Sequence, residues 1–231
     1  MNGVVVNPSA APAPVGADRA TTGAGVDPIP RTKRMLDVAL SGVGLIASAP
    51  LWALIAGLIK LEDGGPVFFA QERVGEGLRV FDALKFRSMI QNAETGVGAL
   101  QAKEHDPRVT RVGRLLRATA MDELPQLWNI FRGDMTFVGP RALRPGEIEV
   151  HANGVHVAMT DVAGYEARHQ VRPGLTGIAQ IFAPRDISRR NKFRYDLLYI
   201  RKRAFWFDVR LILLSFWISF RGTWEDRGQK F

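Results

Sequence analysis

The chain contains no cysteine among its 231 residues. Disulfides and thiolate metal sites are therefore excluded, and the composition suits a reducing compartment. The four histidines show no spacing that is typical of metal ligands. The chemistry of this protein must therefore rest on carboxylates, amines, hydroxyls and the backbone.

Acidic residues are in the minority, since 23 Asp and Glu face 31 Lys and Arg, which gives a net charge of +8. Such a balance favours polyanionic partners, namely nucleic acid, anionic lipid or phosphorylated substrates. Hydrophobic residues make up 46% of the chain, which is enough for a core at this length and excludes global disorder. The placement of the charges has to decide among the partners.

The first 30 residues lack hydrophobic runs and are rich in proline, alanine and glycine. Such a segment buries little apolar surface, so residues 1–30 are predicted to form a disordered tail. No basic segment precedes an apolar run there, which argues against a signal peptide. Ordered structure is expected to begin near Arg31.

One long hydrophobic run is present, because the 22 residues from Val38 to Ile59 carry no charge. A helix of that length measures roughly 33 Å, close to the thickness of a hydrocarbon core. Basic residues flank both ends, with Arg31, Lys33 and Arg34 before the run and Lys60 after it, which favours the cytoplasm for both ends. Pro50 in the middle disfavours a straight helix. We predict a re-entrant membrane helix over residues 31–62, with a kinked spanning helix and a buried soluble helix as the alternatives.

The remaining residues, 63–231, are predicted to form a cytoplasmic catalytic domain of the α+β class. Residues 67–73 and 79–85 flank a glycine-containing turn and are typical of a small β-hairpin. A helix is expected to start near Asp122 and to stop at Gly133. Residues 172–177 are predicted to form a turn-rich loop.

The C-terminal part carries most of the excess charge. The segment 185–203 holds eight basic residues and two acidic ones, and an apolar, aromatic-rich stretch over 205–220 follows it. This order is typical of surface amphipathic helices in the headgroup region of an anionic bilayer. A packed amphipathic core helix is the alternative for the apolar stretch.

Two adjacent carboxylates, Asp122 and Glu123, precede Pro125, a residue that helices tolerate only in the first turn. The positive end of a helix dipole favours phosphate groups. It also lowers the pKa of a carboxylate, which then stays ionised as a nucleophile or metal ligand. The alternative is that these residues only cap the helix.

Six short blocks of sequence follow one another along the chain. They are Pro66 to Gly75, Lys85-Phe86-Arg87-Ser88-Met89, Asp122-Glu123-Leu124-Pro125-Gln126-Leu127-Trp128-Asn129, Arg132-Gly133-Asp134-Met135 with Val138-Gly139-Pro140-Arg141, Arg172-Pro173-Gly174-Leu175-Thr176-Gly177, and Tyr195-Asp196.

With these blocks, the stretch from about Arg31 to Gly222 resembles the bacterial sugar transferase family. It is similar to the short form of the monotopic polyprenyl-phosphate phosphoglycosyl transferases that start exopolysaccharide and O-antigen assembly. The resemblance implies a monotopic α+β protein at the cytoplasmic (inner) membrane, with its catalytic domain on the cytoplasmic face.

The resemblance also implies a reaction in two steps. Asp122 would attack the sugar-bearing phosphate of a nucleotide sugar, which is UDP-linked in this family, and polyprenyl phosphate would then take the phosphosugar from the enzyme. A divalent ion, Mg²⁺ or Mn²⁺, would be held by Glu123 with Asp122 and would bridge the diphosphate oxygens.

The family motifs further imply that several side chains bind the substrate. Some of these side chains could also have a purely structural role. Asp196 could instead pair with Lys192 one helical turn away, Arg141 could be a solvated loop charge, and Arg172 could belong to a tight turn. The implied substrate-binding residues are Lys85, Arg87, Arg141, Arg172, Thr176 and Asp196.

Two other classes of protein would each explain part of the sequence. A nucleic-acid-binding protein would explain the basic charge but has no use for the apolar run, so we expect no nucleic acid partner. A hydrolase using Asp122 and Glu123 is disfavoured, because adjacent side chains at a helix start diverge and cannot bracket one glycosidic bond. The sequence leaves the oligomeric state open, a homo-oligomer included.

Overall fold

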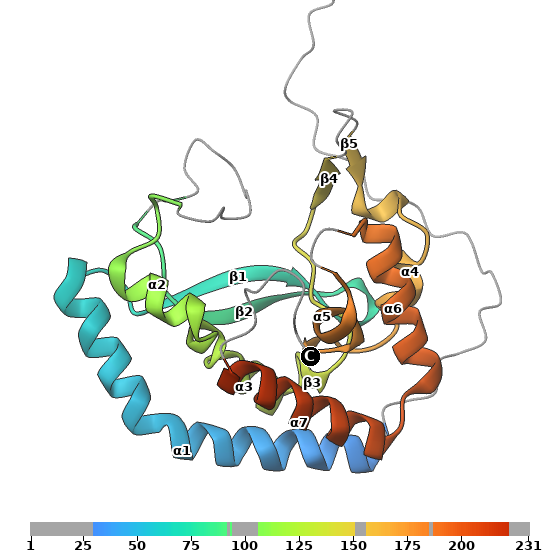
Figure 1. The fold of residues 1–231 in the computed structure, drawn as a ribbon, viewed down its shortest axis with the longest axis horizontal. Helices are drawn as coiled ribbons and strands as arrows, with labels where there is room; N and C mark the ends of the chain where they lie inside the picture. The colour runs from blue at the N-terminus through green and yellow to red at the C-terminus, as the bar shows by residue number, and fades with distance from the viewer. Residues whose placement is uncertain (1–29, 92, 94–105, 151–155, 185–186, 222–231) are drawn as a thin grey trace, which may run out of the picture.

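The computed structural model describes residues 30–91, 93, 106–150, 156–184 and 187–221 (Figure 1). The predicted disordered tail lies, except for Pro30, outside the described residues. The described part is a mixture of helices and small two-stranded sheets, so the predicted α+β class is confirmed.

The elements follow one another without a repeat. The helices are α1 (Arg31–Asp63), α2 (Arg111–Ala118), α3 (Gln126–Arg132), α4 (Tyr165–Arg168), α5 (Ile178–Phe182), α6 (Arg189–Lys202) and α7 (Phe205–Arg221). The strands are β1 (Phe68–Val74), β2 (Val80–Phe86), β3 (Thr136–Val138), β4 (Ile148–Val150), β5 (His156–Ala158) and β6 (Gly174–Thr176).

Helix α1 includes Pro50 and bends in its middle, so its two halves run in different directions (Figure 1). Proline removes a backbone donor and is an established cause of such bends. The Ser48 hydroxyl donates to the Gly44 carbonyl at 2.6 Å one turn before the proline. The predicted break is therefore a bend within one helix. Among the described residues, α1 is the one helix long and apolar enough to cross a membrane.

The first half of α1 is anchored by a buried lysine. Lys33 Nζ donates to Asp208 Oδ2 at 2.6 Å, to the Val138 carbonyl at 3.0 Å and to the Tyr199 hydroxyl at 3.1 Å. The sequence predicted Lys33 to be a flanking charge that sets membrane orientation. It instead lies inside the protein, where its charge is satisfied by α7, β3 and α6.

A second buried contact follows one turn later on α1. The Asp37 carboxylate accepts hydrogen bonds from Thr136 Oγ1 at 2.8 Å and from the Phe137 N–H at 3.1 Å, both in β3. Arg34 donates to the Ile130 and Phe131 carbonyls, each at 2.7 Å, and so caps the C-terminal end of α3. These contacts fix the direction in which α1 leaves the domain.

The far end of α1 is also held. Glu62 accepts the backbone N–H groups of Arg111 and Val112 at 2.7 and 3.1 Å, and thereby caps α2. Asp63 forms an ion pair with Arg87, the residue after β2. Both ends of α1 are therefore tied to the domain, although the middle is exposed.

Strands β1 and β2 pair antiparallel, with Phe68 opposite Phe86, which confirms the predicted hairpin with a shift of one residue. Strands β4 and β5 also pair antiparallel, whereas β3 and β6 are parallel. The sequence predicted a turn-rich loop over residues 172–177. The structure corrects this, because Gly174 to Thr176 pair with β3 and form β6.

The main core lies between α3, β3, α5, α6 and α7. A smaller cluster joins the second half of α1 to β2 and α2 through Ile55, Ile59, Phe86 and Leu116. The buried residues of the main core are Leu127, Ile130, Met135, Phe137, Val138, Ile178, Ile181, Tyr199, Leu211, Ile212 and Ile218.

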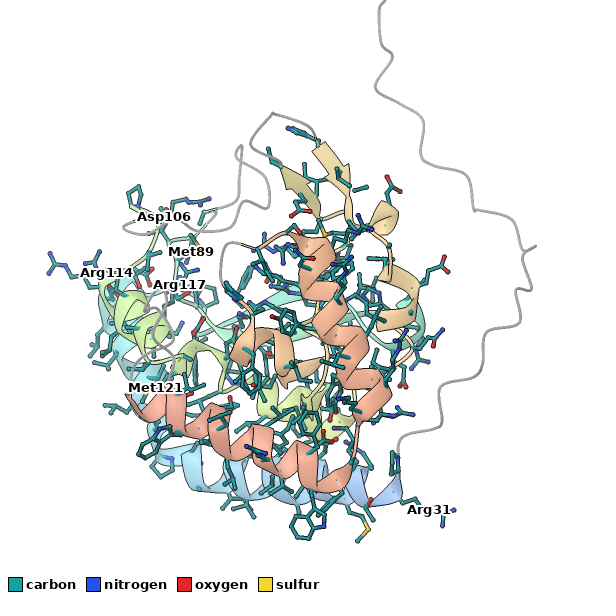
Figure 2. All side chains as sticks on the ribbon, turned by 45° about the vertical axis from the view of Figure 1, so that its right-hand side comes forward. Arg31, Met89, Asp106, Arg114, Arg117 and Met121 are labelled. Carbon is teal, nitrogen blue, oxygen red and sulfur yellow. The ribbon has the colours of Figure 1, made fainter. Side chains whose placement is uncertain are left out.

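The first half of α1 lies beside α7 along one side of the molecule, and the second half turns away toward α2 (Figure 1). Both helices leave large apolar side chains exposed (Figure 2). Exposed surface of this kind is rare on soluble monomers and is typical of contact with lipid or protein. The exposed side chains are Met35, Leu40, Val43, Ile46, Leu54, Leu58 and Leu61 on α1 and Phe205, Trp206, Leu213, Phe216 and Trp217 on α7. We name this set the apolar face.

Helix α7 combines the two readings of the C-terminal apolar stretch, since it buries Leu211 and Ile218 and exposes Trp206 and Trp217. Helix α6 carries much of the basic segment 185–203 and runs from the region of β4 and β5 to the start of α7 (Figure 1). Its cations are therefore spread along a line that leads away from the apolar face. Residues 185 and 186 of the segment lie outside the described residues.

We predict that Lys33→Met lowers the free energy of unfolding by about 3–5 kcal/mol, because Asp208 would stay buried without its counter-charge. Unfolding in detergent micelles, followed by circular dichroism, measures this loss. Arg31→Met removes an exposed charge at the start of the same helix and is the matched control, with an expected change below about 0.5 kcal/mol. Equal effects of the two substitutions would contradict the anchoring role of Lys33.

Candidate active site

The two adjacent carboxylates lie in a sharp turn between α2 and α3. Ala120 adopts a left-handed conformation with a φ of 55°, and residues 121–123 form a single 3₁₀ turn. A left-handed alanine costs about 1–2 kcal/mol, and such strain is common at functional sites. Pro125 is the N-cap of α3 and makes no side-chain capping bond. Helical structure therefore begins near Asp122 as a 3₁₀ turn that carries both carboxylates, and the α-helix begins about one turn later, at Gln126.

Asp122 is buried with 9% of its surface exposed, whereas Glu123 is half-buried and faces a lysine. Lys85 Nζ, on β2, lies 2.6 Å from Glu123 Oε1. A charge-assisted contact of this length between half-buried groups holds both side chains in place. The structure thus brings together three of the predicted site residues.

Asn129 joins β2 to α3 and so sets the distance between Lys85 and Glu123. Its Oδ1 accepts the Leu84 N–H at 2.9 Å, and its Nδ2 donates to the Asp82 carbonyl at 2.7 Å. The side-chain amide thereby satisfies two backbone groups of β2 that a neighbouring strand would otherwise pair with. Asn129 ends the Asp-Glu block of the sequence, and its role in the structure is positioning.

The environments of the two carboxylates move their pKa values in opposite directions. Burial raises the pKa of Asp122 to about 6, with a further rise from Glu123, although the cations Lys85 and Arg117 act against it. Burial would also raise the pKa of Glu123, but Lys85 and Arg141 outweigh it and hold that pKa well below its usual range. The expected lowering of the Asp122 pKa by a helix dipole is therefore wrong, because Asp122 precedes α3 and is desolvated.

Four cations act on this pair, and two of them were missed by the sequence reasoning. Arg117, in the last turn of α2, lowers the pKa of Asp122, and Arg73, in β1, lowers that of Glu123. Figure 2 shows Arg114, on the same helix as Arg117, pointing outward. Helical spacing alone does not distinguish the two arginines, since the fold of the turn decides which one faces Asp122.

The loop that carries Arg141 is held through its carbonyl groups. The Gly174 N–H donates to the Pro140 carbonyl at 2.9 Å, and Arg73 Nη1 donates to the Ala142 carbonyl at 2.9 Å. The loop crosses β6 so closely that a Cβ at Gly174 would lie 2.0 Å from the Gly139 nitrogen. Glycine is therefore required at this crossing, and the Arg141 side chain is exposed beside a fixed backbone.

The other predicted substrate-binding residues have partners elsewhere. Arg87 pairs with Asp63 at the end of α1, and Arg172 Nε lies 3.2 Å from Glu76 Oε2. Thr176 is buried in β6, and its hydroxyl has no hydrogen-bond partner among the described residues.

Asp196 is buried and accepts a hydrogen bond from Arg168 Nε at 2.9 Å. The simpler reading of the sequence pairs Asp196 with Lys192, whereas the structure shows a hydrogen bond from an arginine 28 positions away. Arg168 in turn donates to the Arg141 carbonyl at 2.6 Å. Asp196 is therefore connected to the site through a second side chain.

No group of three or more metal-ligating side chains lies together in the part of the chain that the structure describes. Asp122 and Glu123 supply hard oxygen donors, and Lys85 already occupies one oxygen of Glu123. This donor set fits a Mg²⁺ or Mn²⁺ ion that a carboxylate shares with substrate phosphates, and does not fit a cage made by protein alone.

A model of the bacterial sugar transferase family matches residues 30–222 of this chain. The chain belongs to the bacterial sugar transferase family. It is 44% identical over 192 residues to an undecaprenyl-phosphate glucose phosphotransferase of Komagataeibacter xylinus, a match that covers 79% of this chain and 35% of that protein. The chain thus spans about a third of that larger relative.

Family members of more similar length also match. Identity is 40% over 196 residues to a UDP-glucose:undecaprenyl-phosphate glucose-1-phosphate transferase of Caulobacter vibrioides, covering 80% of this chain and 70% of that one. It is 33% over 195 residues to the exopolysaccharide production protein ExoY of Sinorhizobium fredii, covering 78% and 82%. The family expected from the sequence blocks is confirmed.

We predict that Asp122→Asn stabilises this bacterial sugar transferase at pH 8, by of the order of 3 kcal/mol at most. The raised pKa of Asp122 means that the native state binds a proton more tightly than the unfolded chain. Native stability from this group is therefore complete at low pH and is lost as the pH rises through about 6. The difference in stability between Asp122→Asn and the wild type should therefore vanish near pH 3.5.

Glu123→Gln is the matched comparison, because the lowered pKa of Glu123 gives the opposite sign. Its carboxylate stabilises the fold at neutral pH, and this contribution is lost on acidification, so the glutamine variant should be less stable at pH 8. Thermal unfolding across pH 3.5–8, in buffer with EDTA, measures both. Destabilisation by both variants at pH 8 would contradict the opposed environments.

Proposed function

We propose that this protein transfers a sugar 1-phosphate from a nucleoside diphosphate sugar to polyprenyl phosphate, as the first membrane step of exopolysaccharide-type glycan assembly. The observation that carries the proposal is the site itself. Two adjacent carboxylates with opposed pKa shifts lie among four cations, beside helices that expose an apolar face. Such a site suits a reaction between a charged diphosphate and a lipid-borne phosphate.

The names of the relatives support the choice of substrates. Those of Caulobacter vibrioides and Komagataeibacter xylinus name undecaprenyl phosphate as acceptor, and the former names UDP-glucose as donor. A relative of Aeromonas hydrophila, 39% identical over 183 residues, names UDP-N-acetylgalactosamine. We therefore propose a UDP-sugar as donor and leave the sugar to experiment.

The first step forms a bond between a carboxylate oxygen of Asp122 and the phosphorus that bears the sugar. The bond from that phosphorus to the oxygen bridging the two phosphates breaks, and the nucleoside monophosphate leaves with the electron pair. A pKa near 6 leaves Asp122 largely ionised at neutral pH and more basic than an ordinary aspartate, which favours nucleophilic attack.

The second step reverses this exchange with the lipid. A phosphate oxygen of polyprenyl phosphate attacks the phosphorus of the aspartyl-phosphosugar, and the bond to Asp122 breaks. The products are polyprenyl diphosphate sugar and the free carboxylate. No net proton transfer is needed, so positioning and charge neutralisation have to supply most of the catalysis.

The cations divide this work according to their positions. Arg117 lies near Asp122 and would bind the phosphoryl group under attack, whereas Arg73 and Arg141 act on Glu123 and would bind the second phosphate. Lys85 keeps Glu123 ionised and oriented. With Glu123 and Asp122 as ligands, Mg²⁺ or Mn²⁺ would neutralise charge that develops on the diphosphate.

The proposed membrane arrangement has α1 enter and leave the bilayer through the cytoplasmic face of the inner membrane. Its bend at mid-helix, its exposed apolar side chains and the ties at both ends of the helix to one domain support this topology. A straight spanning helix would place Lys33 and Glu62 on opposite sides of the bilayer. Both residues contact the same domain, which disfavours that alternative.

We expect that the wild-type protein, mixed with radiolabelled UDP-sugar without lipid acceptor and quenched rapidly, carries label on Asp122. Asp122→Asn keeps the shape of the side chain but lacks the nucleophile, so it should carry no label and lose at least about 10³-fold in turnover. Peptide mapping after quenching locates the label. Label on the asparagine variant, or UMP release only when both substrates are present, would overturn the covalent step.

The arginines of α2 provide a matched pair for the same assay. Arg117→Gln should lower the rate of UMP release at least about 10-fold, because it removes a cation beside the reacting carboxylate. Arg114→Gln removes an exposed cation from the same helix and should leave the rate within about 2-fold. Similar losses for both variants would mean that charge on α2 acts on the membrane instead of on the substrate.

The absence of cysteine makes the topology directly testable with single-cysteine variants. Arg31→Cys and Arg114→Cys lie on either side of the apolar stretch of α1, and Ile46→Cys is the control within it, where 79% of the side chain is exposed. A membrane-impermeant maleimide should label the first two in inverted vesicles only, and the control in neither orientation. Labelling of Arg31→Cys in right-side-out vesicles would establish a spanning helix.

A further inference from the structure

A fully buried arginine lies behind the site without touching the carboxylate pair. Arg168, at the end of α4, has 2% of its surface exposed. Its Nε donates to Asp196 Oδ2 at 2.9 Å, its Nη2 donates to the Arg141 carbonyl at 2.6 Å, and its guanidinium lies 4.6 Å from the ring centre of Phe193. One planar group therefore links α6 to the loop that carries Arg141.

The guanidinium is held in one orientation by its surroundings. His169 Nε2 lies 3.2 Å from Arg168 Nη1, and His169 Nδ1 lies 2.7 Å from the Tyr165 carbonyl. A carbonyl only accepts, so Nδ1 carries the proton and Nε2 accepts from the arginine. Asp196 is 4% exposed. The donors of Arg168 are thus assigned to three different acceptors and cannot rotate without losing them.

The Arg141 carbonyl is the second of four consecutive carbonyls that accept hydrogen bonds from the domain. The donors to residues 140, 141, 142 and 143 are Gly174 N at 2.9 Å, Arg168 Nη2 at 2.6 Å, Arg73 Nη1 at 2.9 Å and Val74 N at 2.8 Å. These bonds fix the peptide planes on both sides of Arg141, whose own side chain is exposed.

We propose that Arg168, oriented by Asp196, is a positioning residue that fixes the backbone of Arg141 so that its guanidinium meets the substrate phosphate. This inference rests on the proposed function, because it assigns the phosphate contact to Arg141. It adds Arg168 and Asp196, which act on the reaction only through Arg141.

Stability alone does not account for the pair. Burying two opposite charges has a large desolvation cost, and well-packed apolar side chains of similar volume often give equal or greater stability. Apolar replacements could not donate to the Arg141 carbonyl while being oriented by α6. The planar fork of arginine meets acceptors in two directions at once, and a lysine ammonium on a flexible stem does not.

The test compares Arg168→Lys, Arg141→Ala and the double variant in the full-length protein in nanodiscs, with UMP release from UDP-glucose or UDP-N-acetylgalactosamine as the readout. If Arg168 acts through Arg141, each single variant should lower kcat/KM at least about 10-fold, and the double variant should be no slower than Arg141→Ala. Losses that multiply in the double variant would overturn the proposal. Arg189→Lys, in an ion pair with Glu147 at 2.7 Å, is the control and should stay within about 2-fold.

A second measurement is independent of activity. Hydrogen exchange followed by mass spectrometry should show faster exchange in peptides covering residues 139–144 of Arg168→Lys, with peptides of α3 unchanged. Unchanged exchange over residues 139–144 would overturn the positioning role even if activity falls. Should the wild type release no UMP from any UDP-sugar, the proposed function fails, and the exchange result still decides whether Arg168 fixes this loop.

If Arg168→Lys does not fold, Asp196→Asn provides a milder test of the same pair. Asp196→Asn keeps an oxygen that can accept from Arg168 Nε but removes the charge that holds it. It should show the same changes to a smaller degree, and Arg141→Ala should again mask its kinetic effect. Full activity and wild-type exchange in Asp196→Asn, with Arg168→Lys unfolded, would overturn the role of the pair.

Discussion

The structure depends on two charged side chains of the long apolar helix that enter the interior of the domain. Lys33 meets Asp208, Tyr199 and the Val138 carbonyl, and Asp37 meets the start of β3. A buried charge is tolerated only with its partners in place, so each contact permits one orientation of the helix. Apolar packing alone would allow α1 to slide or rotate against the core.

Because of these contacts, α1 holds the candidate active site in a fixed position relative to itself. Strand β3, which accepts a hydrogen bond from Lys33 and donates two to Asp37, continues directly into the loop of Arg141. The other end of α1 caps α2 through Glu62, and α2 leads into the turn of Asp122. The two sides of the site are therefore each connected to one end of α1. Under the proposed function, a lipid-borne phosphate would meet groups whose position relative to the apolar face is set by these contacts at the two ends of α1.

Local patterns in the sequence predicted the elements whose stabilising contacts are themselves local. The hairpin of β1 and β2 follows from alternation and a glycine turn, and α1 follows from its apolar run. The two carboxylates were found because they stand together in a family motif. What failed are inferences that depend on residues distant in the chain.

Three such failures share one cause. Helical spacing offers Lys192 as the alternative partner of Asp196, but the structure pairs Asp196 with Arg168. Lys33 was interpreted as a surface charge, but it is buried against Asp208, 175 positions later. The Asp122 pKa was expected to fall at a helix start, but burial in the folded turn raises it. Periodicity and spacing report what a segment could do alone, whereas desolvation and ion pairing are fixed only when the segments meet.

Under the proposed function, the opposed pKa shifts of Asp122 and Glu123 give the two adjacent carboxylates different roles. A single buried carboxylate with a strongly lowered pKa would be a poor nucleophile, and one with a strongly raised pKa would be protonated at neutral pH. In this site Lys85 and Arg141 lower the pKa of Glu123, which stays ionised, and Lys85 also opposes the rise in the pKa of Asp122. The negative charge of Glu123 then raises the pKa of Asp122 through an effect that adds to burial. Under the proposed function, Glu123 therefore acts twice, as a ligand for a shared divalent ion and as the neighbour that keeps the nucleophile basic.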